Sequence, residues 1–130
     1  ASRRREPNCT GFIIWMGNEP FPNNANTSVI EYDGIPKPAY HWVKRAFDSS
    51  NITASYERID YNMGEIFTAD IFLTGDLKVS KKLEAEAEIF DIEGQTLQKK
   101  NFIFTGQGYS TFIDEIKWKI TSLKNDIFFL

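Results

Sequence analysis

The sequence predicts a mainly β protein in which an antiparallel β-sandwich follows a shorter segment of strand and helix. Three observations predict it. Apolar and polar residues alternate along residues 52–130, turn-forming residues divide that alternation at regular intervals, and residues 1–48 follow a different pattern. The chain has 130 residues, 42% of them hydrophobic and 15% aromatic, which is enough for the core of one ordinary domain.

The alternation is clearest in three runs of the second half. In 67–73 the odd positions are apolar, and in 83–89 Leu, Ala, Ala and Ile alternate with three glutamates. Ile116, Trp118 and Ile120 share one face of a third run, against charged residues on the other. A period of two indicates strands with one buried and one solvated face, which favours antiparallel sheets. We therefore expect Trp118 in the core.

Turn-forming residues divide the second half into about six strands of roughly 7 to 10 residues. The expected strands are 52–59, 66–73, 83–89, 96–105, 112–120 and 127–130, separated by turns that include 61–65, 91–94, 106–108 and 122–126. Short strands at this spacing are typical of an immunoglobulin-like sandwich. Because the chain stops within the last run, we expect either a sandwich truncated at its C-terminus or an open edge at which two copies make contact.

The first half has a different pattern. Gly11–Met16 is a continuous apolar run, which suits a strand buried on both faces. A polar loop follows, and Pro36 and Pro38 open a helix whose face carries Tyr40, Val43 and Phe47. A buried strand needs partners on both sides, and these residues supply none. Residues 1–48 are therefore predicted to be the end of a larger α/β domain, joined to the sandwich of residues 52–130 by a short polar stretch.

Two residues of the first half are candidates for chemistry. Asn18-Glu19-Pro20 is similar to an acid/base motif found at strand ends of several barrel glycosidases, so Glu19 is interpreted either as an acid/base or, preferably, as a loop residue lining a subsite. Trp15 ends the apolar run and is interpreted either as a core aromatic or as a platform on which a sugar stacks. Both alternatives for Trp15 stay open.

Composition argues against several other classes of function. The net charge of -3 does not favour nucleic acid, and the basic run Arg3–Arg5 is interpreted as a solvated helix end or loop. No stretch approaches the length of a membrane span. Cys9 is the only cysteine, so neither a disulfide nor a zinc set is expected, and Glu84, Glu86 and Glu88 are interpreted as a solvated face rather than a calcium site. We expect no metal and no cofactor.

The segment Gly11–Phe47 resembles glycoside hydrolase family 2, and is most similar to its β-mannosidase and exo-β-glucosaminidase-like branch. The stretches that carry the resemblance are Gly11-Phe-Ile-Ile-Trp-Met-Gly-Asn-Glu-Pro-Phe-Pro22, Ala25-Asn-Thr-Ser28 and Tyr32-Asp-Gly-Ile-Pro-Lys-Pro-Ala-Tyr40. The resemblance implies the last strand, loop and last helix of a (β/α)8 barrel, followed directly by an immunoglobulin-like sandwich. For the second half it covers only fold type and order.

The resemblance also implies where catalysis occurs. In that family the two catalytic glutamates come from the fourth and seventh barrel strands, upstream of this segment, so it implies no catalytic residue here. It implies that Trp15, Asn18 and Glu19 contribute to substrate binding in a parent enzyme that hydrolyses β-O-glycosidic bonds. The fragment itself is predicted to be an inactive accessory region that braces the barrel. Its expected partners are the barrel and the parent's carbohydrate substrate. A periplasmic or extracellular location is favoured for the parent.

A second hypothesis is a free-standing carbohydrate-binding sandwich. It predicts exposed aromatic side chains in a row on one sheet face, and the candidates are Tyr56, Tyr61, Phe72 and Tyr109. Their scatter across strands and turns does not make a clear platform.

Overall fold

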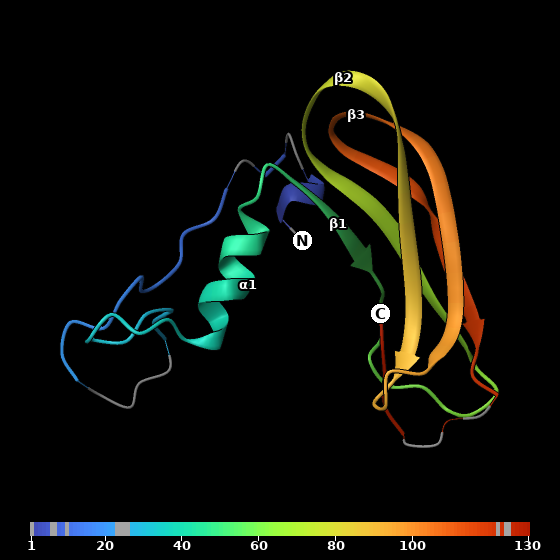
Figure 1. The fold of residues 1–130 in the computed structure, drawn as a ribbon, viewed down its shortest axis with the longest axis horizontal. Helices are drawn as coiled ribbons and strands as arrows, with labels where there is room; N and C mark the ends of the chain where they lie inside the picture. Colours follow the sequence, from blue (N-terminus) through green and yellow to red (C-terminus); the bar gives the residue numbers. More distant parts are fainter. Residues whose placement is uncertain (1, 6–7, 10, 23–26, 122, 124–125) are drawn as a thin grey trace.

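The computed structural model describes residues 2–5, 8–9, 11–22, 27–121, 123 and 126–130, without the side chains of 76–81 and 107. The protein is mainly β, with antiparallel pairing throughout its sheet (Figure 1). Its elements are the 3-10 helix η1 Ser2–Arg5, the helix α1 Pro38–Ala46, and the strands β1 Ser50–Ser55, β2 Ile66–Asp91, β3 Thr96–Lys119 and β4 Phe128–Phe129. The turn expected at 122–126 lies largely outside the described residues.

The sandwich consists mainly of one long hairpin folded over on itself. Strands β2 and β3 pair from Ile66 and Lys119 at the open end to Phe90 and Thr96 beside the turn. Their register shifts repeatedly between positions 74 and 81 of β2, where the hairpin bends. The bend places the first half of β2 opposite its second half, so that the same two strands contribute to both facing layers (Figure 1).

The expectation of six separate strands is therefore wrong. The runs 66–73 and 83–89 are two halves of β2, and 96–105 and 112–120 are two halves of β3. Residues 106–108 do not form a chain-reversing turn. Gly106 pairs with Lys81 and Gly108 with Leu77, and Gly108 has a φ of +70°. Glycine tolerates such backbone, so β3 bends here without leaving the sheet.

The core lies between the two layers and draws on both. Ala69, Ile71 and Ile116 come from one layer and contact side chains such as Ile89 and Phe102 of the other. The predicted inward positions of 67–73 are all buried, and Trp118 is buried with 9% of its surface exposed, as predicted. The buried cluster is made of Phe67, Ala69, Ile71, Ala87, Ile89, Phe102, Ile116, Trp118 and Ile120.

Strand β1 joins the first half of the chain to one layer. It pairs antiparallel with β2, beginning with Ser50 opposite Gly75. Gly75 has a φ of +155°, and a Cβ atom there would lie 2.4 Å from the Ser49 carbonyl oxygen. The chain can cross β2 this closely only because position 75 has no side chain. The polar stretch expected between residues 48 and 52 is shorter than predicted, because β1 already begins at Ser50.

A side chain fixes the turn between β2 and β3. The buried Asp91 accepts hydrogen bonds at its Oδ1 from the backbone N–H groups of Glu93 and Gln95, each at 2.9 Å. Gly94 has a φ of +80°, which favours glycine. The turn predicted at 91–94 is therefore confirmed, with Asp91 as the residue that orients it.

The first half matches its prediction only in part. The expected helix is present as α1, and Tyr40 and Val43 of the expected apolar face are half-buried, but Phe47 is 61% exposed. The expected strand at Gly11–Met16 is not formed. Ile13 is 96% exposed and has no strand beside it among the described residues. A strand buried on both faces needs partner strands on both sides, and the described residues supply none.

Two arginines attach η1 to the rest of the molecule, which corrects the expectation that Arg3–Arg5 is simply solvated. The Arg3 guanidinium donates to the backbone carbonyl oxygens of Ala46, Asp48 and Ser49, where α1 ends and β1 begins. Arg4 donates to the carbonyl oxygen of Ala54 in β1.

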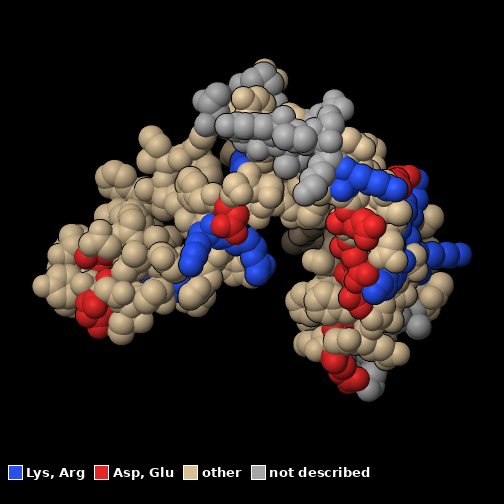
Figure 2. Space-filling model, turned by 45° about the horizontal axis from the view of Figure 1, so that its top comes forward, with Lys and Arg blue, Asp and Glu red and all other residues tan. Residues whose placement is uncertain are grey.

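In the space-filling view the helix-bearing part and the sandwich are separated by a deep recess, with charged side chains of both signs on its walls (Figure 2).

Candidate functional site

The loop that carries the Asn-Glu-Pro motif is held by backbone hydrogen bonds between three stretches. Glu19 N–H donates to the Ile30 carbonyl at 3.1 Å, and Ile30 N–H donates to the Gly17 carbonyl at 3.1 Å. Lys37 N–H donates to the Val29 carbonyl at 3.0 Å, just before α1 begins. These bonds place residue 19, residues 28–30 and residue 37 side by side, although 18 positions separate Glu19 from Lys37.

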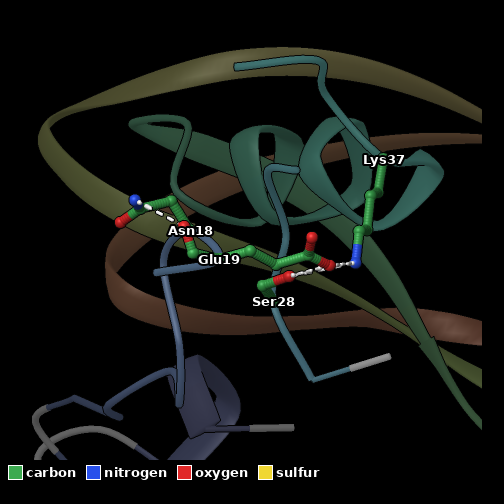
Figure 3. A network of polar contacts seen from close by, with 4 residues as sticks. All are labelled: Asn18, Glu19, Ser28 and Lys37. Atoms are coloured by element: carbon green, nitrogen blue, oxygen red, sulfur yellow. Dashed lines mark hydrogen bonds and ion pairs between the residues drawn. The ribbon is translucent and has the colours of Figure 1, made fainter. Parts of the chain in front are cut away.

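The side chains of Glu19, Ser28 and Lys37 form a polar cluster inside this loop, which we call the Glu19 cluster. The Ser28 hydroxyl donates to Glu19 Oε1 at 3.1 Å, and Lys37 Nζ lies 3.0 Å from Ser28 Oγ. Lys37 Nζ also forms an ion pair with Glu19 Oε1 (Figure 3). Glu19 is 4% exposed and Ser28 is 2% exposed, so the loop has an almost fully buried charged centre.

The ionisation of Glu19 follows from these contacts. The hydrogen bond from Lys37 holds the pKa of the Glu19 carboxyl below its ordinary value of 4.5. Burial acts in the opposite direction, and the Ser28 hydroxyl, the positive charge of Lys37 and the backbone N–H of Tyr32 reinforce the lowering. A general acid must hold a proton near neutral pH, and this carboxylate does not. The geometry therefore suits Glu19 to orienting the loop.

The other two residues predicted for the site do not join this cluster. Trp15 is 80% exposed, so the interpretation as a core aromatic is wrong for the described chain. Asn18 is exposed, and its Nδ2 donates at 3.3 Å to the backbone carbonyl of Glu19 (Figure 3). The loop thus presents Trp15 and Asn18 at its surface and buries Glu19 within it.

Sequence reasoning missed Ser28 and Lys37 as partners of Glu19. Both occur within the quoted stretches, but the residues between them and Glu19 gave no periodicity from which a contact could be inferred. No local signal marked Lys37 as a partly buried cation, because its position between Pro36 and Pro38 says nothing about where its side chain lies.

The aromatic residues of the alternative hypothesis separate into three places. Tyr56 and Tyr61 line one pocket of about 350 Å³ together with Arg58, whose guanidinium carbon lies 4.6 Å from the centre of the Tyr61 ring. Phe72 instead packs against Phe112, with ring centres 5.5 Å apart, and Tyr109 is exposed near the bend of β3. The four side chains do not form one row on a sheet face.

Other kinds of site were sought across the described residues. No group of three or more His, Cys, Asp or Glu side chains there could hold a metal ion. No helix in that part of the chain is long and apolar enough to cross a membrane. Comparison with known protein families, with characterised proteins and with solved structures finds no match to this chain.

Proposed function

We propose that the chain is a non-catalytic C-terminal region of a family 2 glycoside hydrolase, in which residues 1–48 complete a barrel and the sandwich braces it. The resemblance of Gly11–Phe47 supports the family. The order of the chain supports it as well, since a loop and helix lead directly into an antiparallel sandwich. The proposal includes two finer points. The strands of the sandwich are connected as in an immunoglobulin-like domain, and the first half of the chain comes from a barrel.

The observation that carries the non-catalytic assignment is the Glu19 cluster. A retaining glycosidase needs one carboxylic acid that is protonated before it acts, and a second carboxylate about 5 Å away. Glu19 is instead ionised, and its carboxylate forms an ion pair with Lys37 and accepts a hydrogen bond from Ser28. Its role in the proposal is to fix the loop, so that the exposed Trp15 and Asn18 stand at a defined place beside the substrate in the parent enzyme.

The exposed apolar residues of the first half support the proposed contact with a barrel. Ile13 is 96% exposed and Trp15 is 80% exposed, within a run that is otherwise typical of a buried strand. Covering such side chains stabilises a protein by about 1.5–3 kcal/mol for each fully buried residue. Neighbouring barrel strands would supply that cover on both sides of residues 11–16.

An activity assay tests the proposal directly. The chain is incubated with aryl β-mannoside and aryl β-glucosaminide, and release of the aryl group is followed. We expect no turnover, because in this proposal both catalytic glutamates lie on barrel strands upstream of this chain. Turnover by the chain that is abolished in Glu19→Gln would contradict the non-catalytic assignment.

The family assignment has its own test, which is the coding sequence upstream of residue 1. We expect it to encode a barrel with one glutamate at the end of its fourth strand and another at the end of its seventh. In that longer protein, Trp15→Ala should raise the KM for the glycoside more than it lowers kcat, whereas Tyr109→Ala on β3 serves as an exposed aromatic control. An upstream sequence without such a barrel would overturn the assignment.

The pocket lined by Tyr56 and Tyr61 favours carbohydrate binding by the sandwich as a second candidate function. Tyrosine rings beside a charged side chain are suited to stacking and hydrogen bonding with a sugar. Titration with mannan and chitosan oligosaccharides tests this function. We expect binding to weaken in Tyr56→Ala but not in Tyr109→Ala, since Tyr109 is exposed and does not line that pocket. Equal binding by both variants and the wild type would exclude it.

A further inference from the structure

A pocket of about 380 Å³ lies where η1, α1 and β1 meet, on the side of the sandwich that faces the helix. We call it the arginine pocket. It takes no residue from the Glu19 cluster and none from the pocket of Tyr56 and Tyr61. Its lining residues are Ser2, Arg3, Arg4, Phe12, Trp42, Arg45, Ala46, Asn51, Ile52, Thr53 and Thr74.

The lining carries three arginines and no acidic side chain. Arg3 and Arg4 donate to backbone carbonyl oxygens of Ala46, Asp48, Ser49 and Ala54, which are dipoles and do not neutralise a full charge. Arg45 stacks on Trp42, with its guanidinium carbon 5.3 Å from the ring centre. Three positive charges therefore line one half-open pocket, which favours occupation by an anion.

A polar group at the wall of the pocket lacks a partner. The Oγ1 atom of Thr53 is buried and has no hydrogen bond among the described residues. Such groups are rare in folded proteins, because leaving a buried hydroxyl unpaired costs about 1–3 kcal/mol. Because solvent does not reach this atom, a ligand in the pocket could pair with it only after neighbouring side chains move, and the proposal does not depend on it.

The rest of the wall mixes polar and apolar side chains, and the apolar ones include an exposed aromatic ring. Trp42 is 68% exposed and Phe12 is 46% exposed, and Ile52 of β1 is also 48% exposed. A bare inorganic ion would leave this surface in water, whereas a ring carrying the anionic group would cover it.

We propose that the arginine pocket binds a small organic anion, a carboxylate or phosphate ester carried on a sugar or aromatic ring. The planar guanidinium groups pair with the oxyanion through parallel N–H donors, and the ring lies against Trp42 and Phe12. This proposal is independent of the glycoside hydrolase assignment, because it uses only residues and contacts of this chain.

Isothermal titration calorimetry of the whole chain tests the proposal with four probes at matched ionic strength. These are phenyl phosphate, phenyl β-D-glucuronide, neutral phenyl β-D-glucoside and inorganic phosphate. We expect saturable binding of phenyl phosphate, of the glucuronide or of both, which also identifies the oxyanion. The neutral glucoside and inorganic phosphate should bind at least tenfold more weakly. Equal affinity for the charged and neutral phenyl compounds, or for inorganic and phenyl phosphate, would overturn the proposal.

Variants then locate the site. Arg45→Gln should weaken binding about tenfold or more, because it removes a charge-assisted hydrogen bond. Arg45→Lys should lie in between, since it keeps the charge and loses the planar fork. Lys119→Gln removes an exposed charge at the end of β3 and should bind as the wild type does. Far-UV circular dichroism verifies the fold of each variant, and unchanged binding by folded Arg45→Gln would place the ligand elsewhere.

Discussion

Lys100 and Asp114 belong to the same strand, yet they meet between the two layers at the partly exposed edge of the sandwich. Lys100 Nζ lies 2.7 Å from Asp114 Oδ2 and donates at 2.7 Å to the backbone carbonyl of Glu115. The two positions come together only because the hairpin folds over, which brings the first half of β3 opposite its second half. The pair therefore closes the two layers along the free edge of β3, and the hydrogen bond from Lys100 lowers the pKa of Asp114 from its ordinary value of 3.8.

This closure predicts that Asp114→Asn lowers the thermal midpoint of unfolding. Glu86→Gln is the matched control, since Glu86 pairs with Lys99 at 2.8 Å between neighbouring strands on the outer face. We expect the loss in Asp114→Asn to exceed that in Glu86→Gln, because only the former joins the two layers. In a double-mutant cycle Asp114→Asn and Lys100→Gln should be non-additive. Strict additivity would mean that the two groups do not interact in solution.

The close approach at Gly75 gives a second prediction. Gly75→Ala should destabilise the protein by about 1–3 kcal/mol or more, because the added Cβ meets the Ser49 carbonyl and the backbone must keep a positive φ. Gly17→Ala is the control, since nothing lies within 4 Å of a Cβ atom built there. Urea unfolding followed by circular dichroism measures both. A Gly75→Ala protein as stable as Gly17→Ala would show that β1 does not cross β2 in this way.

The shared core predicts that both layers unfold together. Ile116→Ala in one layer and Ile89→Ala in the other should each cost about 2–5 kcal/mol, since both side chains are fully buried. Ile103→Ala should change stability by less than about 0.5 kcal/mol, because Ile103 is 65% exposed. Near-UV and far-UV circular dichroism should give coincident urea transitions. Separate transitions in either core variant would contradict a single core.

Among the described residues, three carboxylates have a lowered pKa and set the expected response to acid. The pKa of Glu19 is lowered chiefly by Lys37, that of Glu65 chiefly by the backbone N–H of Asn62, and that of Asp114 chiefly by Lys100. A lowered pKa in the folded state means that the unfolded chain binds protons first as the pH falls. Their stabilisation is therefore complete above the ordinary values of 3.8 to 4.5 and is lost below them.

Thermal unfolding between pH 3 and pH 7 measures this response. We expect a flat midpoint from pH 7 to about pH 5 and a decline below that. Asp114→Asn should reduce the size of the decline, because it removes one of the titrating groups. A midpoint that rises as the pH falls through this range would reverse the predicted sign.

The sequence predicted the faces of the strands better than their number. Alternation identified Ile116, Trp118 and the inward residues of 67–73 as core, because a period of two depends only on the local backbone. It could not show that β2 continues through residues 74–82, where the pattern weakens at the bend. The same alternation places Lys100 on the face of Phe102 and Asp114 on the face of Ile116. Two opposite charges on inward positions were thus a usable signal for their pairing.

The candidate site was predicted in sequence but not in geometry. Trp15, Asn18 and Glu19 lie close together in the sequence, which suggested a shared surface. The structure buries one and exposes the other two, because the partners of Glu19 come from positions 28 and 37. The arginine pocket was missed for a similar reason. Arg3 and Arg4 contact residues of α1 and β1 that are more than 40 positions away, and no local sequence pattern predicts such contacts.

The hairpin that carries both layers also suggests an order of events in folding. Asp91 fixes the turn through bonds to Glu93 and Gln95, so the nearest pairs of β2 and β3 can form with little loss of chain entropy. Further pairs of β2 and β3 can then form one after another, moving away from the turn. The two layers come together when pairing extends past Gly106 and Gly108 and the hairpin bends there. Strand β1 would dock later, onto a surface already built, because it joins the first half of the chain to the sheet.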